Sequence, residues 1–314
     1  MSVALFMVMN SLIKIVSTTI PTGEIVLSRS FFGLLPILIL IFVKGETLAD
    51  QTQLKGWAVL RTERPWLHLR RGFFGITSMF AGFMALKLLP LADAMVLQFT
   101  APILTGILAV PLLGEVFNKN RFVAVGIGFI GTVLILLPWS PNAGALDGWG
   151  LVFGLGWGIG TSLAMIAIGR MNATEPGMRI VAYFMGFGVV TGLGSLFFAA
   201  VVPTGRELLI LIAIGVSGGL AQLFMTYAYL KAPASVIMPL DYFSLIIAMG
   251  IGLVVFNEVP TVATILGSIL VAGSGVFIVL NTAGMQVKGV RNWRATGWWT
   301  KKQNPAGQGP NESL

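Results

Sequence analysis

Long apolar runs separated by short polar breaks make up most of the chain. A helix needs about 20 mostly apolar residues to cross the hydrocarbon core of a bilayer. Ten runs of roughly this length lie between glycines, prolines and charged clusters, at 2–19, 24–43, 68–88, 91–113, 121–138, 148–169, 178–202, 206–230, 234–256 and 260–281. The pattern therefore predicts an all-α integral membrane protein with ten transmembrane helices.

Most connections between these runs are only a few residues long, so consecutive helices should be antiparallel neighbours. Two polar segments are longer, at about 44–67 and 282–314. With both termini in the cytoplasm, most of the 20 lysines and arginines, Arg70 and Arg71 among them, fall in cytoplasmic segments. The positive-inside rule therefore favours this orientation.

Composition supports a membrane protein and excludes several kinds of site. The chain is 56% hydrophobic and 10% charged, whereas soluble domains carry roughly 25% charged residues. It has no cysteine and one histidine, His68, which we expect in a polar loop. Disulfides and a metal site of histidine and cysteine are thus excluded, and no motif calls for a cofactor.

The net charge of +8 is explained by topology rather than by a nucleic-acid partner. The segment 282–314 is a basic tail that holds Trp293, Trp298 and Trp299. Tryptophan beside lysine and arginine is typical of the lipid headgroup layer. We expect a cytoplasmic tail that contacts membrane lipid.

Two segments of the chain repeat a common pattern. KLLPLADAMVLQFTAPI at 87–103 aligns with LKAPASVIMPLDYFSLI at 230–246, and the alignment pairs Pro90 with Pro233 and Glu115 with Glu258. The repeated unit has five spans, at 1–138 and 148–281, with a short first span. An odd number of spans turns the second copy upside down, and inverted repeats are common in secondary transporters.

The sequence resembles the EamA-domain family of the drug/metabolite transporter superfamily. The second half has P-L-D-Y-x-S-L-I at Pro239–Ile246 and F-N-E-V-P at Phe256–Pro260; the first has L-Q-F-T-A-P at Leu97–Pro102 and L-L-G-E at Leu112–Glu115. The resemblance covers residues 3–281 and implies a ten-helix carrier of the bacterial inner membrane. It also implies a central cavity lined by spans 1, 3, 4, 6, 8 and 9. Some similar sequences import S-adenosylmethionine.

Asp241 is the main candidate for substrate binding. A carboxylate inside a membrane span is costly unless it is protonated, hydrated or paired. Pro239 removes a backbone donor two residues earlier and bends the helix. The repeat places Gln98 in register with Asp241, with Pro102 nearby. These residues form either a substrate cradle or, alternatively, a buried polar contact that only locks helices together.

Other candidates are Lys14 and Arg29, the cations that lie well inside predicted spans rather than at their ends. Each either pairs with Asp241, binds an anionic group, or reaches the headgroups with its long side chain. The remaining candidate substrate contacts are aromatic residues, namely Tyr227, Tyr242 and Trp157. The remaining candidate kink or gating residues are acids at the ends of spans, namely Glu115 and Glu258.

These features predict a secondary transporter that moves a small metabolite, either an amino acid or a related zwitterionic or cationic solute, by alternating access. An exporter of lipophilic cations with the same fold is the alternative, and a membrane enzyme acting on a lipid-linked substrate is a remote one. Asp241 could also carry a coupling proton if burial raises its pKa. Glycine pairs such as Gly215 and Gly219 allow close helix packing, in either a monomer or a homodimer.

Overall fold

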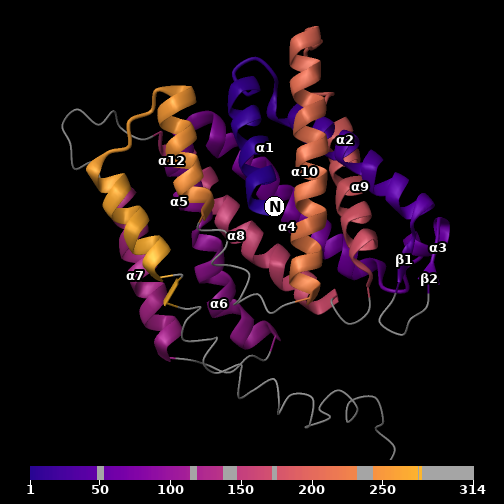
Figure 1. The fold of residues 1–314 in the computed structure, drawn as a ribbon, viewed down its shortest axis with the longest axis horizontal. Coiled ribbons are helices and arrows are strands. Elements are labelled where there is room, and N and C mark those ends of the chain that lie inside the picture. Colours follow the sequence, from indigo (N-terminus) through magenta and orange to yellow (C-terminus); the bar gives the residue numbers. More distant parts are fainter. Residues whose placement is uncertain are drawn as a thin grey trace, which may run out of the picture.

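The computed structural model describes residues 1–47, 53–113, 119–136, 147–171, 175–231, 243–274 and 276–277. These residues are mostly helical (Figure 1). The helices are α1 (Ser2–Val16), α2 (Thr22–Val43), α3 (Trp57–Leu60), α4 (Pro65–Leu88), α5 (Leu91–Gln98), α6 (Thr100–Leu113), α7 (Lys119–Leu136), α8 (Gly148–Met171), α9 (Gly177–Ser195), α10 (Gly205–Lys231) and α12 (Phe243–Phe256). A further helix covers Val262–Ser274.

The prediction of an all-α membrane protein is confirmed. Four described helices are long and apolar enough to cross a bilayer, over Thr22–Val43, Gly148–Met171, Gly177–Ser195 and Gly205–Tyr229. Shorter apolar helices cover Ser2–Val16, Ile247–Phe256 and Val262–Ser274. The β structure in the described residues is one antiparallel pair of two-residue strands, β1 (Glu46–Thr47) and β2 (Gln53–Leu54), after α2.

Helices from the two halves of the chain are interleaved (Figure 1). α2 packs against α9 and α10, α4 packs against α8, and α1 packs against α10. α5 and α6 also contact α8, and α5 contacts α12. The contacts between α1–α6 and α8–α12 therefore form the centre of the molecule, where a substrate site between two halves would lie.

Glycines allow several of these close contacts. On α8, Gly160 faces α4, where an added Cβ would lie 2.7 Å from the Ser78 Cβ. Gly154 lies on another face of α8, where an added Cβ would lie 2.9 Å from the Leu97 Cβ of α5. Gly154 and Gly160 of α8 thus serve contacts within the chain, as small residues do in membrane helices.

The predicted span 91–113 is two helices rather than one. α5 ends at Gln98, and α6 begins at Thr100 after a turn at Phe99. Pro102 has no N–H, so it cannot complete the helical hydrogen bond to the carbonyl of Gln98. In addition, the Thr100 hydroxyl donates to the Leu97 carbonyl at 2.8 Å. Both features favour a break of the helix at this point.

The predicted span 178–202 is shorter than expected. α9 ends at Ser195, and the apolar residues after it include Phe197 and Phe198, which are almost fully exposed. The apolar pattern did not predict the end of α9 at Ser195, because the low helix propensity of the residues near it decides where the helix ends. Glycines recur along the last turns of α9, and the Ser195 hydroxyl donates to the Gly192 carbonyl at 2.6 Å, which competes with continuation of the helix.

The prediction that His68 lies in a polar loop was wrong. His68 lies in the first turn of α4, is 1% exposed, and stacks on Tyr183 of α9 at 4.3 Å between ring centroids. Its Nε2 lies 3.2 Å from Glu175, which also accepts hydrogen bonds from Arg179 and Thr62. Burial alone would raise the pKa of Glu175, but these hydrogen bonds hold it below its usual value. The cluster fixes α4 to the start of α9.

Candidate functional site

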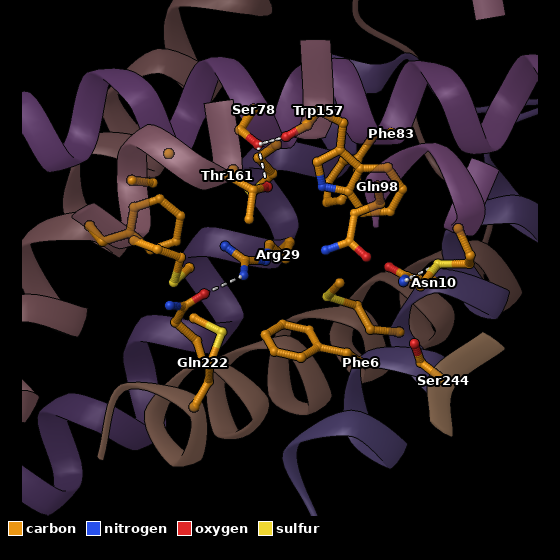
Figure 2. Close-up of a pocket in the computed structure, with 18 of the residues that line it drawn as sticks. Phe6, Asn10, Arg29, Ser78, Phe83, Gln98, Trp157, Thr161, Gln222 and Ser244 are labelled. Carbon is orange, nitrogen blue, oxygen red and sulfur yellow. Dashed lines mark hydrogen bonds between the residues drawn. The ribbon is translucent and has the colours of Figure 1, made fainter. Parts of the chain in front are cut away.

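A cavity of about 140 Å³ lies at the contact between the two halves of the chain (Figure 2). Its lining comes from α1, α2, α4, α5, α8, α9, α10 and α12. They include at least one helix from each of the six spans that the family resemblance implied. They also include α2 and α9, which contribute Arg29 and Phe184.

Arg29 points into the middle of the cavity (Figure 2). Its side chain is 3% exposed, so it does not reach the headgroups. One guanidinium nitrogen donates to Gln222 Oε1 of α10 at 3.3 Å, and another lies 3.9 Å from the Met185 sulfur. Both contacts are to neutral groups. Within the described part of the chain, the positive charge is therefore available to an anion that enters the cavity.

Arg71 is a cavity residue that the sequence analysis missed. It was counted with the cytoplasmic charges because it follows Arg70, but it lies inside α4 and is 3% exposed. Gly75, Ser78 and Met79 follow it on the same lining face. Small and polar residues at helical spacing from an arginine are the signal that could have placed Arg71 in the cavity.

Away from Arg71, the cavity is lined by aromatic rings and side-chain amides. Trp157, Phe83 and Gln98 lie together there, and Asn10 lies nearby (Figure 2). The Ser78 hydroxyl bonds the Trp157 carbonyl at 2.9 Å and the Thr161 hydroxyl at 2.8 Å, which joins α4 to α8. This end offers flat apolar faces with a few hydrogen-bonding groups. Such a mixture is typical of small-molecule sites.

Lys14 lies outside the cavity lining and forms an ion pair with Glu258. The Lys14 Nζ is 3.0 Å from Glu258 Oε1, and the two side chains are 13% and 25% exposed. Lys14 also donates to the Leu89 carbonyl at 2.6 Å, and Glu258 Oε2 accepts from the Leu91 N–H at 2.9 Å. This ion pair connects α1, the α4–α5 turn and the end of α12, which belong to different halves.

The local sequence at the end of α12 directs Glu258 toward this contact. Asn257 follows the helix with φ 53°, a left-handed conformation that asparagine tolerates. The Glu258 N–H then bonds the Gly252 carbonyl, six residues earlier in the chain, at 2.8 Å. The chain turns back over the helix end, and the carboxylate of Glu258 faces α1.

None of the remaining predicted site residues is among the residues that line the cavity in the described part of the chain. Tyr227 is absent from the lining, and its hydroxyl donates to Glu46 Oε1 at 2.8 Å. Pro102 lies in α6, and its side chain is not described. Asp241, Tyr242, Pro239 and Glu115 lie outside the described residues. Ser244, three residues after Asp241, does line the cavity.

The chain is similar to known transporters. The model of the EamA-like transporter family matches residues 1–137 and 147–280. The pseudopaline exporter CntI of Pseudomonas aeruginosa is 30% identical over 267 residues, which cover 85% of this chain and 89% of that protein. The S-adenosylmethionine uptake transporter of Rickettsia felis is 29% identical over 273 residues, 85% of each chain. The riboflavin transporter of Rhizobium johnstonii is 29% identical over 228 residues, 72% of this chain and 74% of that protein.

A solved structure, described only as the crystal structure of a protein, has the same fold. It superposes with a TM-score of 0.66 at 21% identity, and the match covers 89% of this chain and 95% of that one. At this identity the likeness concerns the fold alone.

Proposed function

Because the chain belongs to the EamA-like transporter family, we propose that it moves an amino acid or a related zwitterionic metabolite across the bacterial inner membrane. The observation that carries this proposal is the buried Arg29 guanidinium in a cavity between the two halves. A carboxylate is the natural partner of a guanidinium, since the two can form parallel charge-assisted hydrogen bonds.

The sign of the charge also separates the two candidate solute classes. Of the described residues that line the cavity, the charged ones are Arg29 and Arg71, and both are positive. A lipophilic cation entering this space would meet like charge in a region of low dielectric, which is strongly unfavourable. A solute with a carboxylate is favoured over the exported cation that the sequence left as an alternative.

Asp241 fits the same proposal as the partner of the solute's ammonium group. In the sequence it precedes Ser244 of the cavity lining by three residues. A carboxylate there would bind the positive end of a zwitterion while Arg29 binds the negative end. Protonation of Asp241 would then couple transport to a proton gradient.

Alternating access between two inverted five-helix repeats is the mechanism we propose, with ten spans and both termini in the cytoplasm. Support comes from the pattern of helix contacts. If the second half repeats the first, the contact of α4 with α8 corresponds to that of α10 with α1. Likewise the contact of α2 with α10 corresponds to that of α9 with α4. Such symmetry allows the halves to exchange conformations.

Counterflow in proteoliposomes tests the proposed function. Vesicles preloaded with an unlabelled amino acid should take up the labelled form of the same amino acid, and the recovered label should be chemically unchanged. The screen includes tetraphenylphosphonium as a lipophilic cation. Uptake of that cation alone, with no amino acid exchanged, would contradict the proposal in favour of the exporter.

Two variants test whether the exchanged solute binds in the cavity. Arg29→Gln is expected to lower kcat/KM by about 10- to 100-fold, because a hydrogen bond to a charged group contributes roughly 1.5–3 kcal/mol. Asp241→Asn should lower exchange and remove its dependence on external pH. The control is Arg70→Gln, which removes an exposed arginine and should leave exchange unchanged. Full activity in a folded Arg29→Gln protein would argue against this site.

Gly82→Ala tests the aromatic end of the cavity. An added Cβ at Gly82 of α4 would lie 2.7 Å from the Trp157 ring, so the indole must move. We expect KM for the exchanged solute to rise several-fold while the folded yield stays close to that of the unmodified protein. Gly156→Ala on α8 is the matched control, since its Cβ would lie 3.7 Å from the Ala81 Cβ in ordinary contact. Equal KM values for the two variants would remove Trp157 from the binding site.

A further inference from the structure

Two buried guanidinium groups share one aromatic ring at one end of the cavity. The Arg71 guanidinium carbon lies 4.1 Å from the centroid of the Phe184 ring, and that of Arg29 lies 5.3 Å from the same centroid. The arginines come from α4 and α2, and the ring comes from α9. We refer to Arg29, Arg71, Phe184 and Gln222 as the cationic end.

The electrostatic attraction of the ring is small compared with the burial of two charges. A cation over an aromatic face is attracted only weakly, whereas burial of an unpaired ion carries a much larger penalty. Two like charges beside one ring also repel each other. The ring positions the guanidiniums, but it does not neutralise them.

No described carboxylate forms an ion pair with either arginine. The ion pairs among the described residues join Lys14 to Glu258 and Glu175 to both His68 and Arg179. Three buried guanidinium nitrogens, Arg71 Nε, Arg71 Nη1 and Arg29 Nε, have no hydrogen-bond partner among the described residues. Buried cations that hold the fold together here, such as Arg179, have an acidic partner. Arg29 and Arg71 differ because they face a cavity and have no acidic partner among the residues that the structure describes.

The packing around Arg71 leaves room for its side chain. An added Cβ at Gly75 would collide with the Arg71 guanidinium, and it would lie 2.7 Å from Cε2 of the Phe184 ring. Glycine at this position therefore lets the guanidinium lie beside its own helix and against the ring. Gly75 and Phe184 thus hold Arg71 in place while its Nε and Nη1 have no hydrogen-bond partner among the described residues. This is the arrangement expected of an anion site.

We infer that the cationic end binds a doubly negative oxyanion group of the solute. A single carboxylate satisfies one guanidinium fork, and the second guanidinium would then stay buried without a counter-charge from the described part of the chain. Two carboxylates on one small solute, or one phosphate, would satisfy both. This inference rests on the proposed function and narrows the solute to acidic zwitterions such as acidic amino acids.

Matched pairs of probes test the number of negative charges. Thermal unfolding of the purified protein in detergent would be followed with glutamate against glutamine, aspartate against asparagine, and O-phosphoserine against serine. Each pair keeps the ammonium and the α-carboxylate and differs in the second anionic group. We expect the acidic member to stabilise at a concentration at least about tenfold lower, as a further charge-assisted hydrogen bond implies.

Variants of Arg71 show whether the preference comes from this residue. Arg71→Gln should remove the preference for the acidic member, and Gly75→Ala should reduce it without changing any charge. Arg70→Gln is the matched control and should keep it, because Arg70 is exposed. Size-exclusion chromatography identifies folded variants, and Arg71→Lys replaces Arg71→Gln if the latter aggregates. The lysine variant should show an intermediate preference, since it keeps the charge but loses the planar fork.

The outcomes separate this inference from the proposed function. Preference for O-phosphoserine over the acidic amino acids would identify phosphate as the doubly negative group, and the reverse order would identify two carboxylates. Equal stabilisation by acid and amide, with counterflow intact, would overturn the two-charge group and leave the transporter. Stabilisation by none of the acidic probes would overturn the inference. Acid-selective binding without counterflow of any solute would uphold it and contradict the proposed function.

Discussion

Lys14→Glu is expected to abolish solute exchange, and combining it with Glu258→Lys is expected to restore a large part of it. In the native protein the two side chains form an ion pair 3.0 Å long that joins the first half to the second at the predicted outer ends of their spans. Two carboxylates at this distance repel each other, so the halves could not close there. Alternating access requires closure on each side in turn, so exchange should stop. Reversing both charges restores the attraction.

The absence of cysteine from the chain gives this prediction a direct readout. Thr161→Cys places a thiol in the cavity, and a membrane-impermeant maleimide added outside reports whether the cavity is open to that side. Labelling should be faster with Lys14→Glu than with Lys14 and should slow again in the charge-reversed double variant. Thr18→Cys, an exposed site near the end of α1, is the control for reagent access and should label equally in all backgrounds. Unchanged labelling of Thr161→Cys would show that the ion pair does not control access.

Gly219→Val is expected to prevent formation of a stable folded protein. An added Cβ at Gly219 of α10 would lie 2.6 Å from both the Cα and the carbonyl oxygen of Gly33 in α2. Backbone atoms cannot move aside as a flexible side chain can. Overpacking of a well-packed contact typically destabilises by about 1–3 kcal/mol, and backbone contact makes the upper end of that range, or more, the expected value. The unfolding temperature in detergent and the monodisperse yield measure the effect.

Gly186→Val is the matched control for this substitution. Gly186 also lies within a helix, α9, but an added Cβ there would meet no atom within 4 Å. The same side chain should therefore leave the unfolding temperature unchanged or raise it slightly, since valine is a somewhat better helix former than glycine. If both variants lose the same stability, the close approach of α2 and α10 contributes nothing specific.

Much of the architecture could be predicted from the sequence because transfer of a helix into lipid depends on local composition. Apolar runs located helices within all the predicted ranges, although their lengths were less well predicted. The ends of α5 and α9 depend on single residues. Pro102 withholds one backbone donor, and Ser195 bonds back to Gly192. Averages over an apolar run do not register such effects.

The candidate site could be predicted only in part. Arg29, Gln98 and Trp157 were identified as site residues because a polar or aromatic group stood out within an apolar run, and they line the cavity. Arg71 was not identified, since its neighbours in sequence, His68 and Arg70, made the segment read as a charged loop. Whether a charge at the beginning of a helix faces water or a cavity depends on the helices packed against it.

The sequence by itself determined the class of protein, the approximate helices and the family, because each follows from composition, hydropathy or a contiguous motif. Only the tertiary structure decided which distant residues meet. It paired Lys14 with Glu258, turned Tyr227 toward Glu46, and brought Arg29 and Arg71 to one ring of α9. These contacts join helices far apart in the chain. Their free energy depends on distance and local dielectric, which are properties of the packed molecule and not of any segment read alone.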